Sequence, residues 1–483
     1  MAVDYDVVIV GGTQAGRYAA ITAASLRATV ALVEPLPSQE ITTQSPLVDL
    51  LAPHTLAHVG YLAARRFGIH WHNTDLTNCH VQLNEAMQWA HGVVSNLEDQ
   101  NSPAFLASSG VDFIQGTGQF QQRSRLAFTV NGRSLVARSY IIATNSRPLV
   151  PEIEGLQNAG YITASEIWQS LTAPTPPKRW VILGSDPTGC QLALTLVKLG
   201  FDVTLVVKRA SILAKEDPEI AQLVQATLEA EGVRVLTSAP VILVKRINDR
   251  KWIQAGDQAI ETDEILLCAG QKSNIDELNL EAVGVKWQRQ RLHLNQKLQT
   301  TNPRIYACGD AIGGYHANFA NYEARIALKN ALFFPVFKVD YRSIPWAIFF
   351  DPQLARVGLT EMQARDRYGS DVLVLRQSFK PVAAAQIKDE ITGACKLVVR
   401  RNGAILGAAV VGSQAGELIN AIALAIAHSL NVDALANLAP IYPSFSEILH
   451  QAAADYRGAK LDSSPTLQNF LEAFFNFRRT YYF

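Results

Sequence analysis

Cysteine pairs and an excess of charge of either sign are both missing from this sequence. The 483 residues include five cysteines, none in a CxxC or CxxxxC pair: Cys79, Cys190, Cys268, Cys308 and Cys395. This scatter excludes a secreted disulfide framework and a zinc site built from paired cysteines, and it is typical of a reducing compartment. The 43 basic residues balance the 43 acidic ones, so the charge indicates no nucleic-acid partner.

Long hydrophobic runs are missing as well. The longest, residues 418–427, is far shorter than the roughly 20 residues that cross a bilayer. Residues 1–4 lead directly into an apolar stretch, without the basic segment that opens a signal peptide. We therefore expect a cytoplasmic protein.

The N-terminal residues predict a strand, a glycine-rich turn, a helix and a second strand. Residues 6–10 (DVVIV) form a β-branched apolar run typical of a buried parallel strand, and GGTQAG follows at residues 11–16. A second apolar run at residues 28–33 ends at Glu34. This succession is a βαβ unit, whose turn presents backbone amides and a helix N-terminus to a pyrophosphate.

Each residue type of this turn has a defined part in dinucleotide binding. The glycines allow the backbone to approach the phosphates, Thr13 occupies the usual middle glycine position and can cap the helix, and Glu34 can bind a ribose hydroxyl. The alternative for Glu34 is a solvated strand end. The candidate binding residues here are Gly11, Gly12, Thr13, Gly16 and Glu34.

The same pattern returns 173 residues later. Residues 180–183 (WVIL) lead into GSDPTG at residues 184–189, and an apolar run at 203–207 follows. In both copies 23 residues separate the first glycine from the end of the second strand. A repeat in this register predicts two nucleotide-binding folds, within a chain long enough for about three domains.

Several further stretches resemble the disulfide oxidoreductase family of glutathione reductase, dihydrolipoamide dehydrogenase and mercuric reductase. IIATNSRP at 141–148, AGQKSN at 269–274 and TTNPRIYACGDA at 300–311 are similar to its flavin-side turns. Residues 344–361 resemble the start of its dimerisation domain. The resemblance implies a homodimer with bound FAD, to which Thr144, Arg147, Gly309 and Asp310 would contribute, Asp310 by holding the ribityl chain.

The family's redox centre is not present in this sequence. Residues 36–64 contain neither the family's CxxxxC pair nor a lysine, and Gln191 stands where the family has a glutamate that pairs with that lysine. The family's HPxxxE motif is YPSFSE here, which leaves Tyr442 and Glu447 as candidate catalytic residues. An unperturbed tyrosine has a pKa near 10 and is a poor base; the alternative for Tyr442 is a packed aromatic side chain at the dimer contact.

The second turn is expected to bind NAD(P)H, through Gly184, Gly189 and, by resemblance, Gly270. Asp186 occupies the middle glycine position, where a carboxylate would repel a pyrophosphate; the alternative is a helix N-cap with Pro187 at the first helical position. Lys208 and Arg209 follow the second strand without an acid, which favours the 2′-phosphate of NADPH over NADH. An ordinary basic loop is the alternative.

Some residues outside these motifs need a separate interpretation. His54 and His58 could share a helix face, but no third ligand has matching spacing, and we predict no metal site. Cys308 precedes the GD motif. It either packs as a small apolar residue or takes part in the redox reaction. The segment 467–483 is rich in Phe and Tyr beside two arginines, with apolar residues at helical spacing. It suits a membrane interface or docking on protein.

We therefore expect an α/β protein with two Rossmann-like three-layer domains and a C-terminal α+β dimerisation domain. The boundaries are 1–150 with 272–338 for FAD, 151–271 for NAD(P), 339–460 for dimerisation and 461–483 for the tail. The leading hypothesis is an FAD oxidoreductase that passes electrons from NADPH to a small non-disulfide acceptor such as a quinone. The alternatives are reduction by a protein donor such as ferredoxin, and a non-catalytic FAD-bound scaffold or sensor.

Overall fold

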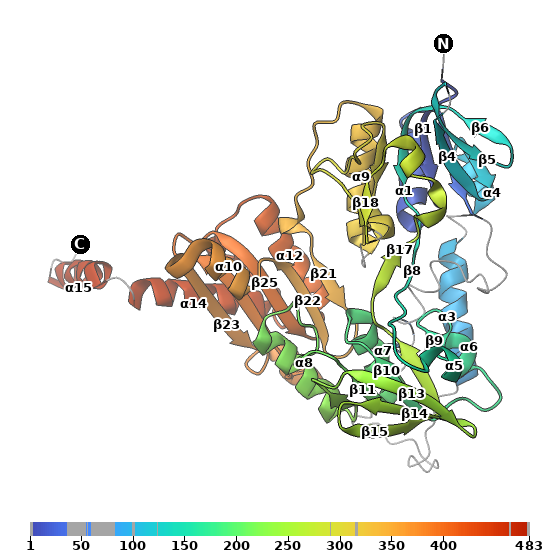
Figure 1. Cartoon of the computed structure of the whole chain (residues 1–483). Helices are drawn as coiled ribbons and strands as arrows, with labels where there is room; N and C mark the ends of the chain where they lie inside the picture. The colour runs from blue at the N-terminus through green and yellow to red at the C-terminus, as the bar shows by residue number, and fades with distance from the viewer. Residues whose placement is uncertain are drawn as a thin grey trace. The chain divides into compact units, whose positions relative to one another are not determined.

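The computed structural model describes residues 3–35, 55, 57–58, 83–98, 102–122, 124–289, 291–313, 317–462 and 465–480. It separates into two compact units (Figure 1). The first comprises Met1–Ala210 with Glu231–Asp340, and the second comprises Ser211–Ala230 with Tyr341–Phe483.

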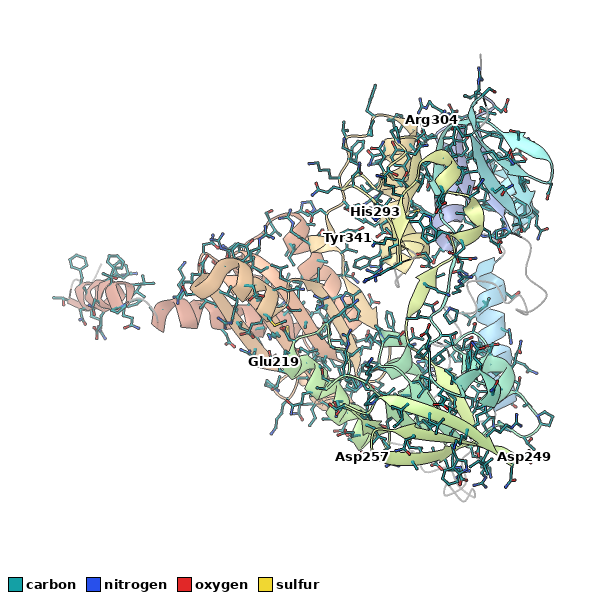
Figure 2. All side chains as sticks on the ribbon, viewed as in Figure 1. Glu219, Asp249, Asp257, His293, Arg304 and Tyr341 are labelled. Carbon is teal, nitrogen blue, oxygen red and sulfur yellow. The ribbon has the colours of Figure 1, made fainter. Side chains whose placement is uncertain are left out.

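A parallel five-stranded sheet forms the first nucleotide fold, in the order β20-β7-β1-β2-β3. Its strands are β1 (Tyr5–Val10), β2 (Val30–Glu34), β3 (Val111–Gln115), β7 (Ala137–Ile142) and β20 (Ile305–Ala307). Arg304, labelled in Figure 2, precedes β20 and donates from Nε to the Arg138 carbonyl of β7 at 3.0 Å. The edge strand β20 thus comes from about 160 residues downstream of β7, its neighbour in the sheet.

Alanine-rich helices cover one face of this sheet. The helices α1 (Gln14–Ser25) and α9 (Ala317–Leu332) contact each other, and the buried face of α1 consists of Ala15, Gly16, Ala19, Ala20 and Ala23. Small side chains allow the helix backbones to lie close to the sheet and to each other. An antiparallel sheet of β4 (Gly118–Gln122), β5 (Leu126–Val130) and β6 (Arg133–Leu135) shares a second core with the parallel sheet. The helices α3 (Leu83–Glu98) and α4 (Pro103–Ser108) also belong to the first unit.

The second nucleotide fold repeats this plan with the order β12-β11-β10-β16-β9, all parallel. Its strands are β9 (Ile162–Thr163), β10 (Arg179–Leu183), β11 (Asp202–Val206), β12 (Arg234–Leu236) and β16 (Glu264–Leu267), with α7 (Pro187–Lys198) after β10. Beside it lie α5 (Leu156–Ala159), α6 (Ile167–Leu171) and an antiparallel sheet of β13 (Val241–Ile247), β14 (Arg250–Ala255) and β15 (Gln258–Thr262). Two short pairs, β8 (Ser146–Pro148) with β17 (Gln271–Ser273) and β18 (Trp287–Gln288) with β19 (Arg291–Leu292), complete the strands of the first unit.

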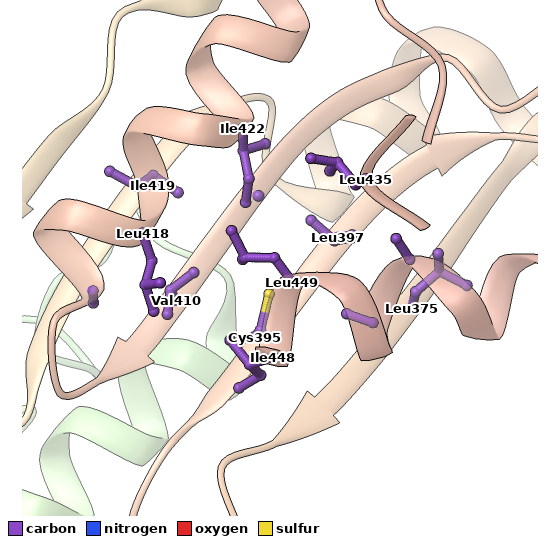
Figure 3. Close-up of a cluster of buried hydrophobic side chains, with 14 of the residues drawn as sticks. Leu375, Cys395, Leu397, Val410, Leu418, Ile419, Ile422, Leu435, Ile448 and Leu449 are labelled. Atoms are coloured by element: carbon purple, nitrogen blue, oxygen red, sulfur yellow. The ribbon is translucent and has the colours of Figure 1, made fainter. Parts of the chain in front are cut away.

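An antiparallel sheet in the order β21-β22-β25-β24-β23 forms the second unit. The strands are β21 (Trp346–Ile348), β22 (Gln353–Gly358), β23 (Val372–Ser378), β24 (Ala394–Arg400) and β25 (Ile405–Gly412). Its helices are α8 (Pro218–Ala230), α10 (Glu361–Tyr368), α11 (Ala383–Lys388), α12 (Ala415–Ala427), α13 (Val432–Ala436), α14 (Glu447–Asp462) and α15 (Pro465–Thr480). Figure 3 shows how Ile422 of α12 and Leu449 of α14 converge on Leu397 in the buried core.

The helix α8 belongs to the second unit although the chain places it between β11 and β12 of the first. A group of ionic contacts holds it there. Lys396 of β24 pairs with Asp217 at 3.0 Å, with Glu361 at 2.8 Å and with Glu219, which Figure 2 labels. Asp217 also accepts a 3.0 Å bond from the Glu361 amide. We call these four residues the Lys396 cluster.

The expected fold class is confirmed: two parallel α/β folds are followed by a mixed α/β region with an antiparallel sheet. The strands predicted at 6–10, 28–33, 180–183 and 203–207 are β1, β2, β10 and β11. No helix in the part of the chain that the structure describes has the length and apolar character needed to span a bilayer. The domain boundaries given above stay predictions.

Candidate functional site

The first glycine-rich turn joins β1 to α1 and has no room for side chains at two positions. Gly11 has a φ of +118°, and a Cβ there would lie 2.2 Å from the carbonyl oxygen of Ala143. A Cβ on Gly16 would lie 2.1 Å from the carbonyl oxygen of Gly11. Both glycines are therefore required by the backbone, which brings the start of α1 against the ends of β1 and β7.

Thr13 caps α1 in the position where the motif usually has its middle glycine. Its hydroxyl donates to the Ala143 carbonyl at 2.8 Å and accepts from the Gly16 amide at 3.3 Å. The side chain therefore supplies a capping acceptor to the helix and fastens the turn to the end of β7.

Glu34 lies at the end of β2 beside Gly12, where a Cβ would come within 2.3 Å of the Glu34 carboxyl carbon. The carboxylate pairs with Arg17 of α1 at 2.6 Å, and Arg17 Nε donates to the Gly12 carbonyl at 2.9 Å. Arg17 is a site residue that the motif did not reveal, because the glycine pattern specifies no residue one position after its last glycine. An adenosine ribose bound to Glu34 would compete with Arg17 for the carboxylate.

Two polar groups after β7 are buried with an atom that lacks a hydrogen-bond partner. The Thr144 hydroxyl has none among the described residues, and its backbone nitrogen adjoins the Gly11 turn. Arg147, on β8, pairs with Asp276, but its Nε is also buried without a hydrogen-bond partner in the described segments. Unsatisfied buried polar atoms are rare in native proteins, so a polar ligand is expected here.

Gly309 and Asp310 form the third part of this edge. Gly309 has a φ of +65°, and a Cβ there would lie 3.3 Å from the side chains of both Ala15 and Ala320. Its amide donates to the buried carboxylate of Glu323 at 2.8 Å. Burial raises the pKa of Asp310 to about 6. Glu323 was missed because nothing in its own helix sequence marks it.

The structure therefore brings the predicted FAD residues to one edge of the first sheet. The Gly11 turn and Thr144 adjoin each other, Gly309 lies against α1, and Ser273 Oγ donates to the Asp310 carbonyl at 3.4 Å. Arg147 joins them through the pairing of β8 with β17. The individual roles of these residues toward FAD stay predictions.

The second turn has the same backbone form but carries an acid. Gly184 has a φ of +111°, and a Cβ there would lie 2.0 Å from the Cys268 carbonyl. Asp186 caps α7 by accepting from the Gly189 amide at 2.8 Å, with Pro187 as the next residue. Burial raises the pKa of Asp186 to about 6. The N-cap interpretation is therefore what the structure shows, and a role of this turn in binding a pyrophosphate stays a prediction.

The other predicted dinucleotide residues surround this turn in sequence and in the fold. Gly270 follows β16 with a φ of +113° and accepts from the Leu149 amide at 2.9 Å. Lys208 and Arg209 are exposed after β11, and no carboxylate within the described residues forms an ion pair with either of them. They remain available to a phosphate.

The candidate catalytic pair lies in the second unit. Tyr442 is 75% exposed. Glu447 begins α14 and accepts from the Ser444 amide at 3.0 Å. One turn later, the buried Nε2 of His450 has no hydrogen-bond partner within the described segments. The sequence reasoning did not consider His450, because it lies outside the motif that drew attention to Tyr442.

Comparison with known proteins settles the family. Residues 5–328 match the family described as pyridine nucleotide-disulphide oxidoreductase, and residues 344–453 match its dimerisation domain. The chain belongs to this family. It is 30% identical over 462 residues to a mercuric reductase of Staphylococcus aureus, with 94% of this chain and 82% of the relative covered. It is also 30% identical over 457 residues to a dihydrolipoyl dehydrogenase of Bacillus subtilis (strain 168), covering 92% and 97%.

Solved structures share the fold of this family member. The HOCl-induced flavoprotein disulfide reductase RclA of Escherichia coli superposes with a TM-score of 0.80 at 24% identity, over 94% of this chain and 99% of that one. LpdA of Mycobacterium tuberculosis gives 0.81 at 24% identity, over 93% and 99%.

Family membership makes the chain an FAD-dependent oxidoreductase of the class that uses NAD(P)H, and its dimerisation domain supports the predicted homodimer. The residues present fit FAD, since the Gly11 turn admits a close phosphate and the Thr144 hydroxyl has no hydrogen-bond partner among the residues that the structure describes. When bound, FAD would supply the capacity to accept and release two electrons.

The structure describes four of the five cysteines of this chain. Cys190, Cys268, Cys308 and Cys395 are all buried and free. Burial raises the pKa of each thiol, that of Cys395 to about 12. The interval 36–64, Cys79 and His54 lie outside the described residues, except for positions 55, 57 and 58. Among the described residues, no group of three or more His, Cys, Asp or Glu side chains could hold a metal ion.

Proposed function

We propose that this protein passes electrons from NAD(P)H through FAD to a small acceptor that is not a disulfide, such as a quinone. The observation that carries the proposal is the chemistry of its cysteines. The sequence has no CxxxxC pair, and the four described thiols are buried with raised pKa values. Because the thiolate is the nucleophile of disulfide exchange, such thiols do not serve a dithiol relay.

The residues of the site have separable tasks in this reaction. The N-terminus of α1 and the Gly11 turn bind the pyrophosphate of FAD, and Glu34 binds its adenosine ribose once Arg17 is displaced. Asp310 holds the ribityl chain. At the second turn, Lys208 and Arg209 bind the 2′-phosphate of NADPH. The balance is one hydride from NADPH and one proton from solvent, which together convert a quinone to a quinol.

A protein electron donor is the second candidate, and Asp186 favours it. The ionised carboxylate at the N-terminus of α7 repels a pyrophosphate and takes the Gly189 amide that would otherwise face it. If the second fold binds no dinucleotide, electrons must reach FAD from another protein, such as a ferredoxin.

Anaerobic reduction of the purified yellow protein tests the proposal. The visible flavin band is followed during titration with NADPH and then NADH, with dithionite as the positive control. We expect NADPH to bleach the flavin and quinone to restore the band without any added disulfide. If dithionite reduces the flavin and neither nucleotide does, the nicotinamide donor is wrong and the protein donor replaces it.

The acceptor is tested separately, with the protein already reduced. A quinone, glutathione disulfide, lipoamide and Hg(II) are each added at equal concentration, and recovery of the flavin band is timed. We expect recovery with the quinone only. Faster recovery with a disulfide than with the quinone would overturn the non-disulfide acceptor while leaving FAD and its donor in place.

A further inference from the structure

The helix α15 is joined to the second unit through α14 and buries none of its residues. Figure 1 shows it projecting beyond the end of α14 rather than packing against the sheet. The family's dimerisation domain matches only as far as residue 453. The helix α15 therefore lies outside the part of the chain that the family model covers. Membership of the family does not explain its presence.

One face of α15 is apolar and largely aromatic. At 100° per residue, one face carries Leu467, Phe470, Leu471, Phe474, Phe475 and Phe477, and it is interrupted only by Arg478 in the last turn of the helix. The exposed fractions of Phe470, Phe475 and Phe477 are 64%, 54% and 56%. Phe470 stacks on Phe474, with ring centroids 6.3 Å apart. Free energy would be gained by removing this face from water, so it is built to contact an apolar phase.

The opposite face is polar, with Glu472 and Arg479 as its charged residues among Gln468, Asn469 and Asn476. Arg478 and Arg479 end the helix, and neither forms an ion pair within the described part of the chain. Arg479 donates to the Asn476 side chain. In the sequence, two tyrosines and a phenylalanine follow at 481–483. Aromatic side chains next to arginines suit the boundary between acyl chains and anionic headgroups.

The length of α15 and the width of its apolar face indicate how it would contact lipid. Its 16 residues make a helix of about 24 Å, shorter than the roughly 30 Å core of a bilayer. The apolar arc also includes the adjacent residues Phe474 and Phe475. These make the arc wider than the narrow a/d seam of a two-stranded coiled coil. A broad aromatic face on a short helix is the form of an interfacial helix lying in the membrane plane.

We propose that α15 binds the surface of an anionic lipid bilayer, with its phenylalanine face in the acyl boundary and Arg478 and Arg479 against lipid phosphates. This goes beyond the proposed electron transfer and does not depend on it. It would place the flavoprotein on the phase in which lipid-soluble quinones dissolve.

Vesicle flotation of the full-length holoprotein tests the proposal. Vesicles of phosphatidylcholine alone are compared with vesicles containing phosphatidylglycerol. We expect the protein to float with the anionic vesicles, and the variant Phe470→Ser/Phe474→Ser/Phe475→Ser to lose at least about a hundredfold in affinity. The matched control, Gln468→Ser/Asn469→Ser/Asn476→Ser, changes the polar face by the same number of substitutions and should float like the wild type.

The arginines are tested with Arg478→Gln/Arg479→Gln, for which we expect about fivefold weaker binding per arginine on anionic vesicles and little change on neutral ones. Bound flavin and sedimentation are measured on every variant without vesicles. Failure of the wild type to float on either vesicle would overturn the proposal. So would flotation that is indifferent to the phenylalanines, or loss of the dimer in the phenylalanine variant, which would make the partner subunit the surface that α15 covers. None of these outcomes bears on reduction of the flavin by NADPH.

Discussion

At Gly11 the backbone and a neighbouring carbonyl leave no place for a methyl group. The variant Gly11→Ala would put its Cβ 2.2 Å from the Ala143 oxygen at a φ of +118°, so the turn must move away from the position that admits a phosphate. We expect FAD affinity to fall by roughly tenfold or more, since about 1.4 kcal/mol of distortion suffices for that. The ratio of flavin to protein absorbance after gel filtration measures it.

The control for this substitution is Gly458→Ala in α14, where a Cβ would meet nothing within 4 Å. Alanine is the better helix former by about 1 kcal/mol, so this variant should retain FAD and unfold slightly later. If Gly11→Ala also retained its flavin, the first turn would not be the FAD site.

Asp186 gives the second turn a pH dependence. Because burial raises its pKa to about 6, the carboxylate is charged above that pH and neutral below it. Affinity for NAD⁺, whose pyrophosphate does not titrate in this range, should therefore rise as the pH falls through about 6. The variant Asp186→Ser keeps a capping oxygen without the charge, and it should bind about tenfold to a hundredfold more tightly at neutral pH. Isothermal titration from about pH 5 to 7 measures both effects.

The matched control is Asp202→Ser, which removes an exposed carboxylate from the opposite end of β11. It should leave the affinity and its pH step unchanged. A wild-type affinity that is flat across this range would mean that Asp186 does not face the ligand, and the case for a protein donor would lose its support.

At the scale of elements, the Lys396 cluster fixes α8 to the sheet of the second unit. The Lys396 side chain is 4% exposed and contacts three carboxylates. The variant Lys396→Met leaves those carboxylates without their buried cation, which should lower the free energy of unfolding by about 3 kcal/mol. We take the low end of the usual range because the Glu219 side chain is 42% exposed. Urea unfolding measures it, with the exposed Lys380→Met as control.

Acid should weaken the same cluster in the wild type. Burial alone would raise the pKa of Glu361, but hydrogen bonds from Lys396 and Arg365 lower it to about 2. A lowered pKa means that Glu361 stabilises the fold above its unfolded value near 4.3 and that this contribution is lost as the pH falls toward 2. Lys396→Met should reduce that loss; an identical acid profile in the two proteins would contradict the role of the cluster.

Local sequence predicted those elements whose formation is itself local. The β-branched runs gave β1 and β10 to within a residue or two, and their glycine turns followed from backbone geometry alone. The assignment of α8 to the second unit was not predictable, because it depends on charges at Asp217 and Lys396 that are 179 positions apart. Arg17 and Glu323 were missed for the same reason, since each acquires its role from a partner on another element.

At the scale of the whole molecule, the chain keeps the architecture of its family but lacks the CxxxxC pair of cysteines. Both nucleotide folds and the dimerisation domain are present, and the glycine turns retain the backbone that binds a dinucleotide. The buried thiols instead pack in the cores, as Cys395 does beside Leu397 and Val410. A flavoprotein of this kind is expected to transfer electrons directly between FAD and its substrates.

Thiol blocking distinguishes this from a dithiol relay. The described cysteines are buried with raised pKa values. The remaining one, Cys79, is replaced in the variant Cys79→Ser. Treatment of the folded variant with iodoacetamide should therefore leave NADPH-to-quinone turnover within about twofold of the untreated protein. Mass spectrometry reports which cysteines were modified, and dihydrolipoyl dehydrogenase treated while reduced supplies the positive control. Loss of flavin reduction or of quinone turnover in step with modification would show that a cysteine carries the electrons. Retained turnover in a sample whose cysteines mass spectrometry shows to be alkylated would place the transfer at the flavin itself, because no free thiol would remain to carry it.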